Sequence, residues 1–201
     1  FSDVQDFEIE IERVNGSIIL SPHNFDDKNI SRELYGKYNA GIVIFKNNNE
    51  GKKVLKWWKN KCFNYCDSKF NAELNIYADQ KYLDNFFVIS KNVKILDHPG
   101  INCAPWNLNN YKLKLGSEKK IIYVNEKKLI LYHFHSFKFL LNKFYIHNLK
   151  DYNVNEDEMI KIIYKNYIKN FIKINNFKIE KINLLNIFQN LKFFLKSILK
   201  K

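Results

Sequence analysis

Arginine and long apolar runs are scarce in this chain of 201 residues, and both shortages narrow its possible functions. Arg13 and Arg32 are the only arginines among 33 basic residues. Arginine is the usual reader of guanine, through two parallel hydrogen bonds, so we expect no nucleic-acid partner that is recognised by its bases. No segment reaches the ~18 consecutive apolar residues that a membrane-spanning helix needs. The sequence therefore predicts no membrane span.

Cysteine is also rare. Three cysteines cannot all pair within the chain, which favours a reducing compartment, and we expect a cytoplasmic location. One alternative groups Cys62, Cys66, His98 and Cys103 as four ligands of a zinc ion. However, Cys62 and Cys66 are four residues apart on an expected helix, where two thiols can be small core side chains. The core role is the favoured one.

The start of the chain lacks the features of a translation start and of a secretion signal. Its single methionine is Met159, so Phe1 is not an initiator residue, and we expect a fragment or a processed product. Residues 1–6 carry acid in place of the basic and then apolar pattern of a signal peptide. We therefore expect no secretion signal.

Lysine, asparagine and isoleucine are in excess. The formal net charge is +12, and 46% of the residues are hydrophobic, so the composition is that of a folded protein with a basic surface. Such a charge favours an anionic partner, either nucleic acid or a membrane surface. Yet 31 of the 33 basic residues are Lys, accompanied by 29 Asn and 25 Ile. All three have codons rich in adenine and thymine, so genome composition explains part of the charge.

Short β-branched runs alternate with helical patterns in the first half of the chain. Three runs have the pattern of buried strands, namely 17–21, 41–45 and 93–96. Apolar residues at helical spacing predict a helix over 50–67 with Asn49 as its N-cap. A second, shorter helix is expected to start near Ala78. Residues 98–110 form a long connection that we expect its own side chains to hold.

The second half of the chain changes from strands to helices. The runs 120–124 and 128–134 predict a hairpin. Helical spacing follows over 156–174 and 182–199. The order of the elements predicts an α/β protein, with a mixed sheet domain and a basic amphipathic helical tail. The expected division is into residues 1–150 and residues 151–201.

Four short motifs contain the residues that could carry chemistry. In chain order they are Asn39-Ala40-Gly41, Asp79-Gln80, Trp106-Asn107 and His133-Phe134-His135. On a strand successive side chains alternate, so His133 and His135 would share one face, and their imidazoles could converge on one metal ion. The alternative is a pair of partly buried histidines bonded to the backbone.

The other three motifs allow both a binding and a structural role. Asp79, at an expected helix start, either caps the helix or holds a sugar or acceptor hydroxyl, whose proton it would remove if the reaction inverts the anomeric centre. Residues 39–41 either let a ligand approach the backbone closely or form a turn into a strand. Trp106 and Asn107 offer a ring that stacks on a sugar and an amide that anchors it, or they fix the loop to the core.

In this order the four motifs resemble the later part of the GT-A nucleotide-sugar glycosyltransferases, above all the family 8 type and related bacterial sugar transferases. The resemblance covers roughly Ser17 to Phe139. It implies part of a GT-A fold and transfer of a sugar from a nucleoside-diphosphate donor to a hydroxyl of a glycan or lipid-linked acceptor. It also implies a divalent metal, Mn²⁺, that bridges the diphosphate.

The same resemblance implies a role for each motif residue. Asp79 and Gln80 would lie at the sugar-transfer centre as the catalytic pair, and His133 would bind the metal. The implied substrate-binding residues are Asn39, Ala40, Gly41, Trp106, Asn107 and His135.

The sequence also departs from the family pattern. No Asp-x-Asp metal motif occurs near the start, and residues 1–3 resemble those that directly follow it, so we expect the metal-binding carboxylates and the nucleotide-binding half upstream. Ser136 stands where the family has glycine, and no Pro-Trp follows Lys138. Catalytic activity is therefore expected of a longer parent protein.

The helical pattern near the C-terminus suggests a membrane contact. Between 182 and 200 an apolar stripe lies beside Lys192, Lys196 and Lys200. Such a helix either lies on an anionic membrane or packs on the domain with a solvated lysine face. The first alternative predicts peripheral contact with the inner face of the membrane. The competing hypothesis for the whole chain is a non-enzymatic basic module that binds RNA or an anionic membrane, but the motif order favours the transferase.

Overall fold

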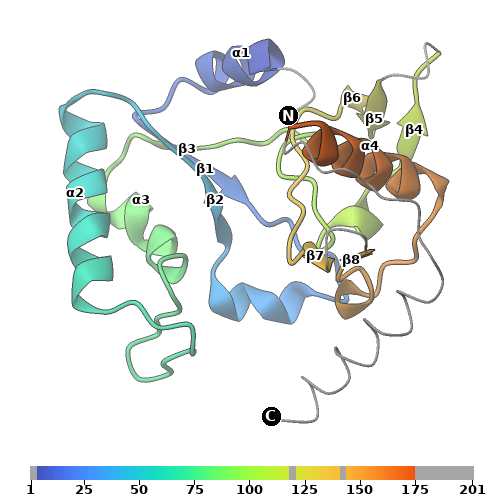
Figure 1. Cartoon of the computed structure of the whole chain (residues 1–201). Helices are drawn as coiled ribbons and strands as arrows, with labels where there is room; N and C mark the ends of the chain where they lie inside the picture. Colours follow the sequence, from blue (N-terminus) through green and yellow to red (C-terminus); the bar gives the residue numbers. More distant parts are fainter. Residues whose placement is uncertain (1–3, 118–120, 141–143, 175–201) are drawn as a thin grey trace, which may run out of the picture.

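The computed structural model describes residues 4–117, 121–140 and 144–174 (Figure 1). This part of the chain is a mixed α/β structure, in which η denotes a 3₁₀ helix. The elements are α1 (Val4–Val14), β1 (Ile18–Pro22), η1 (Ile30–Tyr35), β2 (Tyr38–Phe45), α2 (Asn49–Asn64), η2 (Lys81–Asn85), α3 (Phe86–Ile89), β3 (Val93–Ile95), η3 (Leu108–Asn110), β4 (Leu113–Leu115), β5 (Ile122–Val124), β6 (Lys127–Lys128), β7 (Lys138–Leu140), β8 (Phe144–Ile146), η4 (Lys150–Tyr152) and α4 (Glu158–Ile174). In the described ranges no helix is long and apolar enough to cross a membrane. The helix expected over 182–199 lies outside them.

A three-stranded sheet lies at the centre of the molecule, with strand order β2-β1-β3. β1 pairs antiparallel with β2 and parallel with β3. Side chains alternate along β1, so Ile18 and Leu20 join the core on one face while Ile19 joins the core on the other. This accounts for the continuous apolar run in the sequence, since both faces of β1 are buried.

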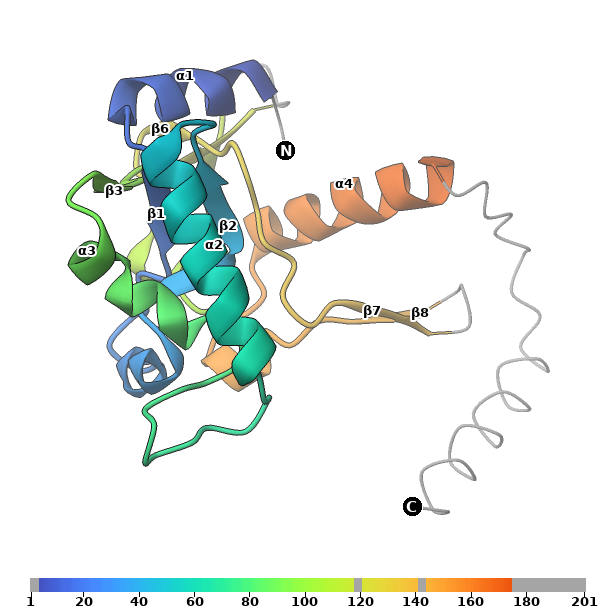
Figure 2. The ribbon, with the colours of Figure 1, turned by 90° about the vertical axis from the view of Figure 1, so that its left-hand side faces the viewer.

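Helices cover the two faces of this sheet (Figure 2). On one face lie Val54 of α2, Leu83 of η2 and Phe86 of α3, all three fully buried. On the other face α1 contributes Phe7 and Ile11. The sheet is therefore the middle layer of a three-layer arrangement, and β2 is one of its two outer strands.

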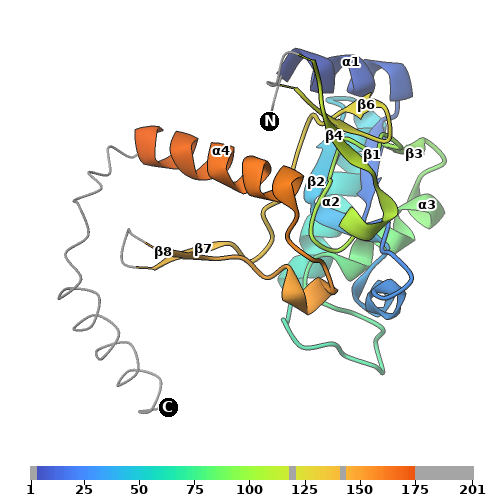
Figure 3. The ribbon, with the colours of Figure 1, turned by 90° about the vertical axis from the view of Figure 1, so that its right-hand side faces the viewer.

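The second half of the described chain builds a core of its own. β4, β5 and β6 form a small antiparallel sheet. Val124 of β5, Trp106 of the preceding loop and Tyr164 of α4 belong to one buried cluster, together with Leu149 and Tyr152. Residues on both sides of position 150 share this cluster, so the packing shows no boundary there. Beyond it, α4 and the β7–β8 hairpin project together from the body (Figure 3).

Most strong apolar patterns of the sequence are confirmed, with local corrections. The expected strands are β1, β2 and β3, and the expected helices over 50–67 and 156–174 are α2 and α4. The predicted N-cap Asn49 is wrong, because Asn48 Oδ1 accepts from Gly51 N at 2.8 Å. Asn48 Nδ2 also donates to Ser17 Oγ at 3.0 Å, which ties the start of α2 to the start of β1.

The helix expected from Ala78 starts later than predicted. Ala78 has a φ of 46°, outside the right-handed helical region. A 3₁₀ helix begins at Lys81 and passes into the single α-helical turn of α3. Asp79 and Gln80 therefore lie in the turn before the helix.

The hairpin is confirmed at its turn but not along its second strand. Asn125 and Glu126 join β5 to β6 with φ of 46° and 67°, as a two-residue type I′ turn requires. β6 ends at Lys128, so the strand predicted over 128–134 is wrong in its extent.

Leu129 N still donates to the Ile122 carbonyl of β5 at 2.7 Å, but residues 130–134 follow the loop 98–107 instead. His133 N donates to the Cys103 carbonyl at 2.8 Å, and Tyr132 forms an isolated parallel bridge with Cys103. Pairing with a distant loop has replaced the hairpin ladder here, and no local pattern indicates such a change.

We predict that Gly51→Ala destabilises the fold by about 1–3 kcal/mol. The new Cβ would overlap the Lys46 carbonyl oxygen and lie 3.1 Å from the Ser17 carbonyl oxygen, where only backbone could move. Urea unfolding measures the change. Lys52→Ala, one residue further along α2 and exposed, should change the free energy of unfolding by less than ~0.5 kcal/mol. Equal midpoints for the two variants would contradict the close approach of α2 to this backbone.

Candidate functional site

A chain of hydrogen bonds joins His23, after β1, to the beginning of β2. His23 Nδ1 donates to the Lys37 carbonyl at 3.2 Å, which leaves its Nε2 as an acceptor. Asn39 Nδ2 donates to that Nε2 at 3.1 Å, and Asn39 Oδ1 accepts from Gly41 N at 2.7 Å. His23 and Asn39 are both buried. The expectation that Asn39 bonds a ligand hydroxyl is therefore corrected, because its amide orients β2 from within the protein.

Gly41 and His133 lie against each other. A Cβ on Gly41 would be 2.9 Å from His133 Cε1 and 2.5 Å from Asn39 Oδ1. Gly41 is exposed and belongs to an outer strand of the sheet. Since no side chain lies between them, the imidazole of His133 reaches the backbone of β2 directly.

The Trp106 ring contacts three imidazoles. Its ring centroid lies 4.9 Å from that of His133, 5.4 Å from that of His135 and 5.1 Å from that of His23. The indole is only 2% exposed. The predicted stacking of Trp106 on a sugar does not fit this burial, and the ring instead fixes the positions of the histidines.

His133 and His135 are neighbours for a different reason from the predicted one. His135 N donates to the His133 carbonyl at 2.8 Å and Ser136 has a φ of 55°, so the chain turns here and forms no strand. The ring centroids are 5.9 Å apart with planes tilted by 40°. The rings lie together because both contact Trp106.

Burial keeps these imidazoles neutral. It lowers the pKa of His133 to about 4, with a smaller contribution from His135. Burial also lowers the pKa of His135, and Arg32 acts in the same direction. Near neutral pH the lone pair of His133 is therefore free of a proton, as binding to a divalent metal or to a hydrogen-bond donor requires.

Asp79 and Gln80 lie in the turn before η2, which contacts both β2 and α2, and they do not line the space beside His133. Gln80 Oε1 accepts from Ala40 N at 3.5 Å, and its Nε2 donates to the Tyr35 carbonyl at 3.2 Å. The Asp79 carbonyl accepts from Trp58 Nε1 at 2.9 Å, so this turn is attached to α2. Ala40 packs toward the same face as α2, away from His133.

Asn107 has the structural role that the sequence left open. It is 1% exposed, and its Nδ2 donates to the carbonyls of His23 at 2.7 Å and Asn102 at 3.1 Å. Its Oδ1 accepts from Ala104 N at 2.9 Å. The prediction that loop 98–110 is held by its own side chains is thus confirmed, whereas direct contact of Asn107 with a sugar does not fit.

A hollow of about 570 Å³ opens beside His133. It combines the exposed backbone of β2, one imidazole and an apolar wall. Its lining consists of Phe7, Gly41, Ile42, Val43, Ile44, Leu131, Tyr132, His133, Phe134 and Tyr167. Of the predicted site residues, Gly41 and His133 line this hollow, while Asn39, Trp106 and His135 support it from behind.

A metal ion would find only part of its ligands here. Within the described ranges no three His, Cys, Asp or Glu side chains are grouped so as to hold a metal. His133 and His135 offer two imidazoles of the type that Mn²⁺ or Zn²⁺ accepts. Two imidazoles alone do not complete the coordination of either ion.

The cysteines are divided between two places. Cys103 is fully buried beside Ala104 and Trp106, and burial raises the pKa of its thiol to about 12. Cys62 lies in the last turn of α2, and Cys66 lies beyond the end of the helix and is exposed, so a core role for Cys66 is wrong. Burial and then the neighbouring thiol raise the pKa of Cys62 to about 11. All three are free thiols.

Sequence reasoning missed His23. It follows Pro22 directly after a buried strand, and a polar residue at that position was the available signal. Nothing local, however, indicates that loop 98–107 covers it.

Comparisons with known proteins find two relatives in Bacillus subtilis (strain 168). The chain is 32% identical over 161 residues to the uncharacterized protein YfnD, and this alignment covers 79% of the chain and 50% of YfnD. It is 27% identical over 138 residues to the uncharacterized protein YfnF, covering 69% of this chain and 44% of YfnF. The chain thus spans about half the length of the curated relatives it matches. No family model and no solved structure matches it.

We predict that the protein loses stability as the pH falls from 6.5 to 4, because burial lowers the pKa of His23 from 6.5 to about 4. As the pH falls, the His23 imidazole of the unfolded chain takes up a proton before that of the folded protein. The free energy of unfolding is therefore at its full value above pH 6.5 and is lower by up to ~3 kcal/mol below pH 4. Urea unfolding at stepwise pH values measures it. His23→Gln, which keeps a polar side chain but cannot titrate, should show a smaller loss over this range; an unchanged loss would assign it to other groups.

Proposed function

We propose that this chain is part of a GT-A type glycosyltransferase that uses a nucleoside-diphosphate sugar, and that it contains the residues that bind the diphosphate and the acceptor. The observation that carries the proposal is the neutral imidazole of His133 lying over the exposed backbone of Gly41 at the edge of β2. A hollow large enough for a sugar phosphate opens at this point.

The convergence of separate motifs supports this function. The motifs 39–41, 106–107 and 133–135 are far apart in the sequence but meet around Trp106 and Gly41. Their order along the chain resembles that of the nucleotide-sugar transferases.

In the proposed site His133 would be one ligand of a divalent metal, Mn²⁺, with His135 next to it. When bound, the metal would neutralise charge that develops on the leaving diphosphate. The residues of the chain have their own tasks. Gly41 leaves room for the His133 ring, Asn39 holds the Gly41 amide, and Trp106 excludes water behind the two imidazoles.

Asp79 and Gln80 would serve the acceptor. Asp79 is half-buried in the turn before η2, and Gln80 bonds the backbone of β2. In transfer, the acceptor oxygen forms a bond to the anomeric carbon while the bond from that carbon to the diphosphate breaks, and the hydroxyl proton passes to the departing diphosphate. Asp79 and Gln80 do not line the hollow, so their role would be to hold the acceptor. The acceptor would be a hydroxyl of a glycan or of a lipid-linked sugar, with the reaction in the cytoplasm.

We predict that His133→Ala weakens Mn²⁺-dependent nucleotide binding more than tenfold, because removing a metal ligand typically costs at least that much. Calorimetric titration with UDP and GDP, each with and without Mn²⁺, measures this in the longest natural polypeptide that contains the chain. His147→Ala removes an imidazole remote from the hollow and should bind like the unaltered protein. Equal affinity of the His133 variant, or binding independent of Mn²⁺, would overturn the proposal; tight binding to single-stranded RNA that falls steeply with salt would favour the basic-module alternative.

A second prediction concerns Gly41→Ala. The added methyl group would force the His133 ring or the Asn39 amide to move, so nucleotide affinity should fall by about tenfold while the fold persists. The same titration measures affinity, and circular dichroism checks folding. Val43→Ala, at the same strand and also lining the hollow, removes atoms without displacing His133 and should have a smaller effect. A larger loss in Val43→Ala would place the ligand elsewhere in the hollow.

A further inference from the structure

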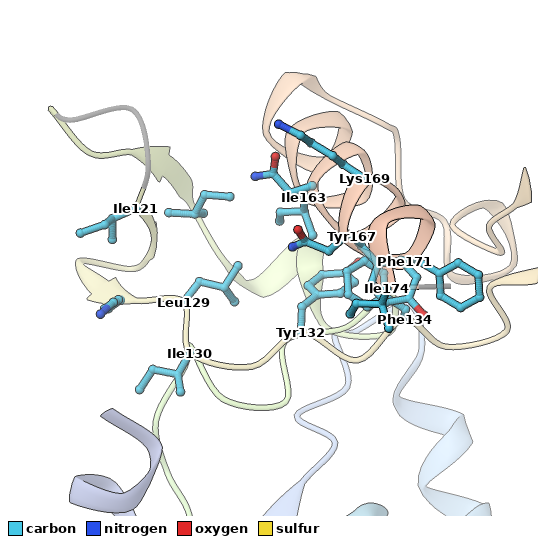
Figure 4. A pocket seen from close by; sticks show the side chains of 14 residues that line it. Ile121, Leu129, Ile130, Tyr132, Phe134, Ile163, Tyr167, Lys169, Phe171 and Ile174 are labelled. Atoms are coloured by element: carbon cyan, nitrogen blue, oxygen red, sulfur yellow. The ribbon is translucent and has the colours of Figure 1, made fainter. Parts of the chain in front are cut away.

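A groove of about 810 Å³ lies between α4 and the segment that runs from β5 to Phe134 (Figure 4). One wall is formed by Ile163, Tyr167 and Phe171 of α4. The opposite wall includes Leu129 and Ile130, and Figure 4 shows these side chains on the other side of the opening from the helix. The volume is within the range of small-molecule sites in proteins.

The lining of this groove is apolar with a basic rim. Ten of its 14 lining residues are Ile, Leu, Phe or Tyr, two are Asn, two are Lys, and none is acidic. Lys169 is exposed on α4, whereas Lys128 forms an ion pair with Asp6. An elongated apolar ligand with a negative end matches this arrangement, because its chain would leave water while its charge meets Lys169.

The groove adjoins the hollow beside His133. Tyr132, Phe134 and Tyr167 line both. The short segment around His133 therefore has an apolar groove on one side and the proposed sugar-phosphate hollow on the other.

We propose that this groove binds the hydrocarbon chain of an anionic amphiphile, a long-chain alkyl or prenyl phosphate. The Lys169 ammonium pairs with the phosphate, and the aromatic and branched side chains of α4 and of 129–134 cover the chain. If this amphiphile is the acceptor of sugar transfer, the inference rests on the proposed function. The binding of its hydrocarbon chain in the groove does not depend on that function.

The test is calorimetric titration of the full chain with octyl, decyl and dodecyl phosphate, below the concentrations at which they form micelles. Affinity should rise roughly tenfold for each two methylene groups that enter the groove. Dodecyl trimethylammonium, which has the same chain and the opposite charge, should bind at least tenfold more weakly. Inorganic phosphate should not bind measurably.

Two pairs of variants locate the binding. Lys169→Glu should lower the affinity for dodecyl phosphate about tenfold. Asn170→Trp, which fills the groove from an exposed position, should abolish binding. Lys165→Glu and Lys165→Trp change an exposed residue of the same helix that does not line the groove, and should bind normally.

Three results would overturn the proposal. The first is an affinity for alkyl phosphates that does not depend on the length of the alkyl chain. The second is an equal loss of affinity from substitutions at positions 165 and 170. The third is binding to phosphatidylglycerol vesicles alone, unchanged by Asn170→Trp, which would indicate that the protein binds a bilayer surface. Mn²⁺-dependent nucleotide binding is measured separately. If the protein binds nucleotide but no alkyl phosphate, only the inference about the groove is rejected. If it binds alkyl phosphate but no nucleotide, only the proposed sugar transfer is rejected.

Discussion

The hydrogen bonds of the Asn107 amide hold the loop 98–107 against the end of β1, and the candidate site depends on them. The side chain joins the carbonyls of His23 and Asn102 to the amide of Ala104. An amide with this set of partners is stable in the interior because every bond replaces one to water, and loss of any partner would leave a buried polar group unpaired. With the loop fixed, Trp106 is buried, and the histidines have a rigid wall to lie against.

The same burial determines the chemistry of the imidazoles. His133 sits where its charged form is penalised, so its pKa falls and its lone pair is available. The polar chain from Lys37 through His23 and Asn39 to Gly41 keeps β2 in register beneath it. Stability and the geometry of the candidate site are therefore coupled here, because the contacts that desolvate the histidines also position them.

The irregular segment 129–134 produces two different surfaces. Because it follows the loop at Cys103 instead of continuing the hairpin, it leaves the small sheet and passes between β2 and α4. His133 then faces Gly41, while Tyr132 and Phe134 contact Tyr164 of α4. A regular strand would have paired its backbone with β5 and closed the space in which both the hollow and the groove lie.

The sequence by itself determined the elements whose apolar pattern is strong, namely β1, β2, α2 and α4, together with the α/β class and the order of the motifs. It also indicated a hairpin turn at 125–126, because asparagine tolerates positive φ. Only the tertiary structure decided that Trp106 and Asn107 are buried, that His23 joins the cluster, and that 129–134 is not a strand. The physical reason is that burial and strand pairing depend on contacts between residues far apart in the chain. The same Asn or Trp can serve a ligand or a core, and the local sequence does not distinguish the two.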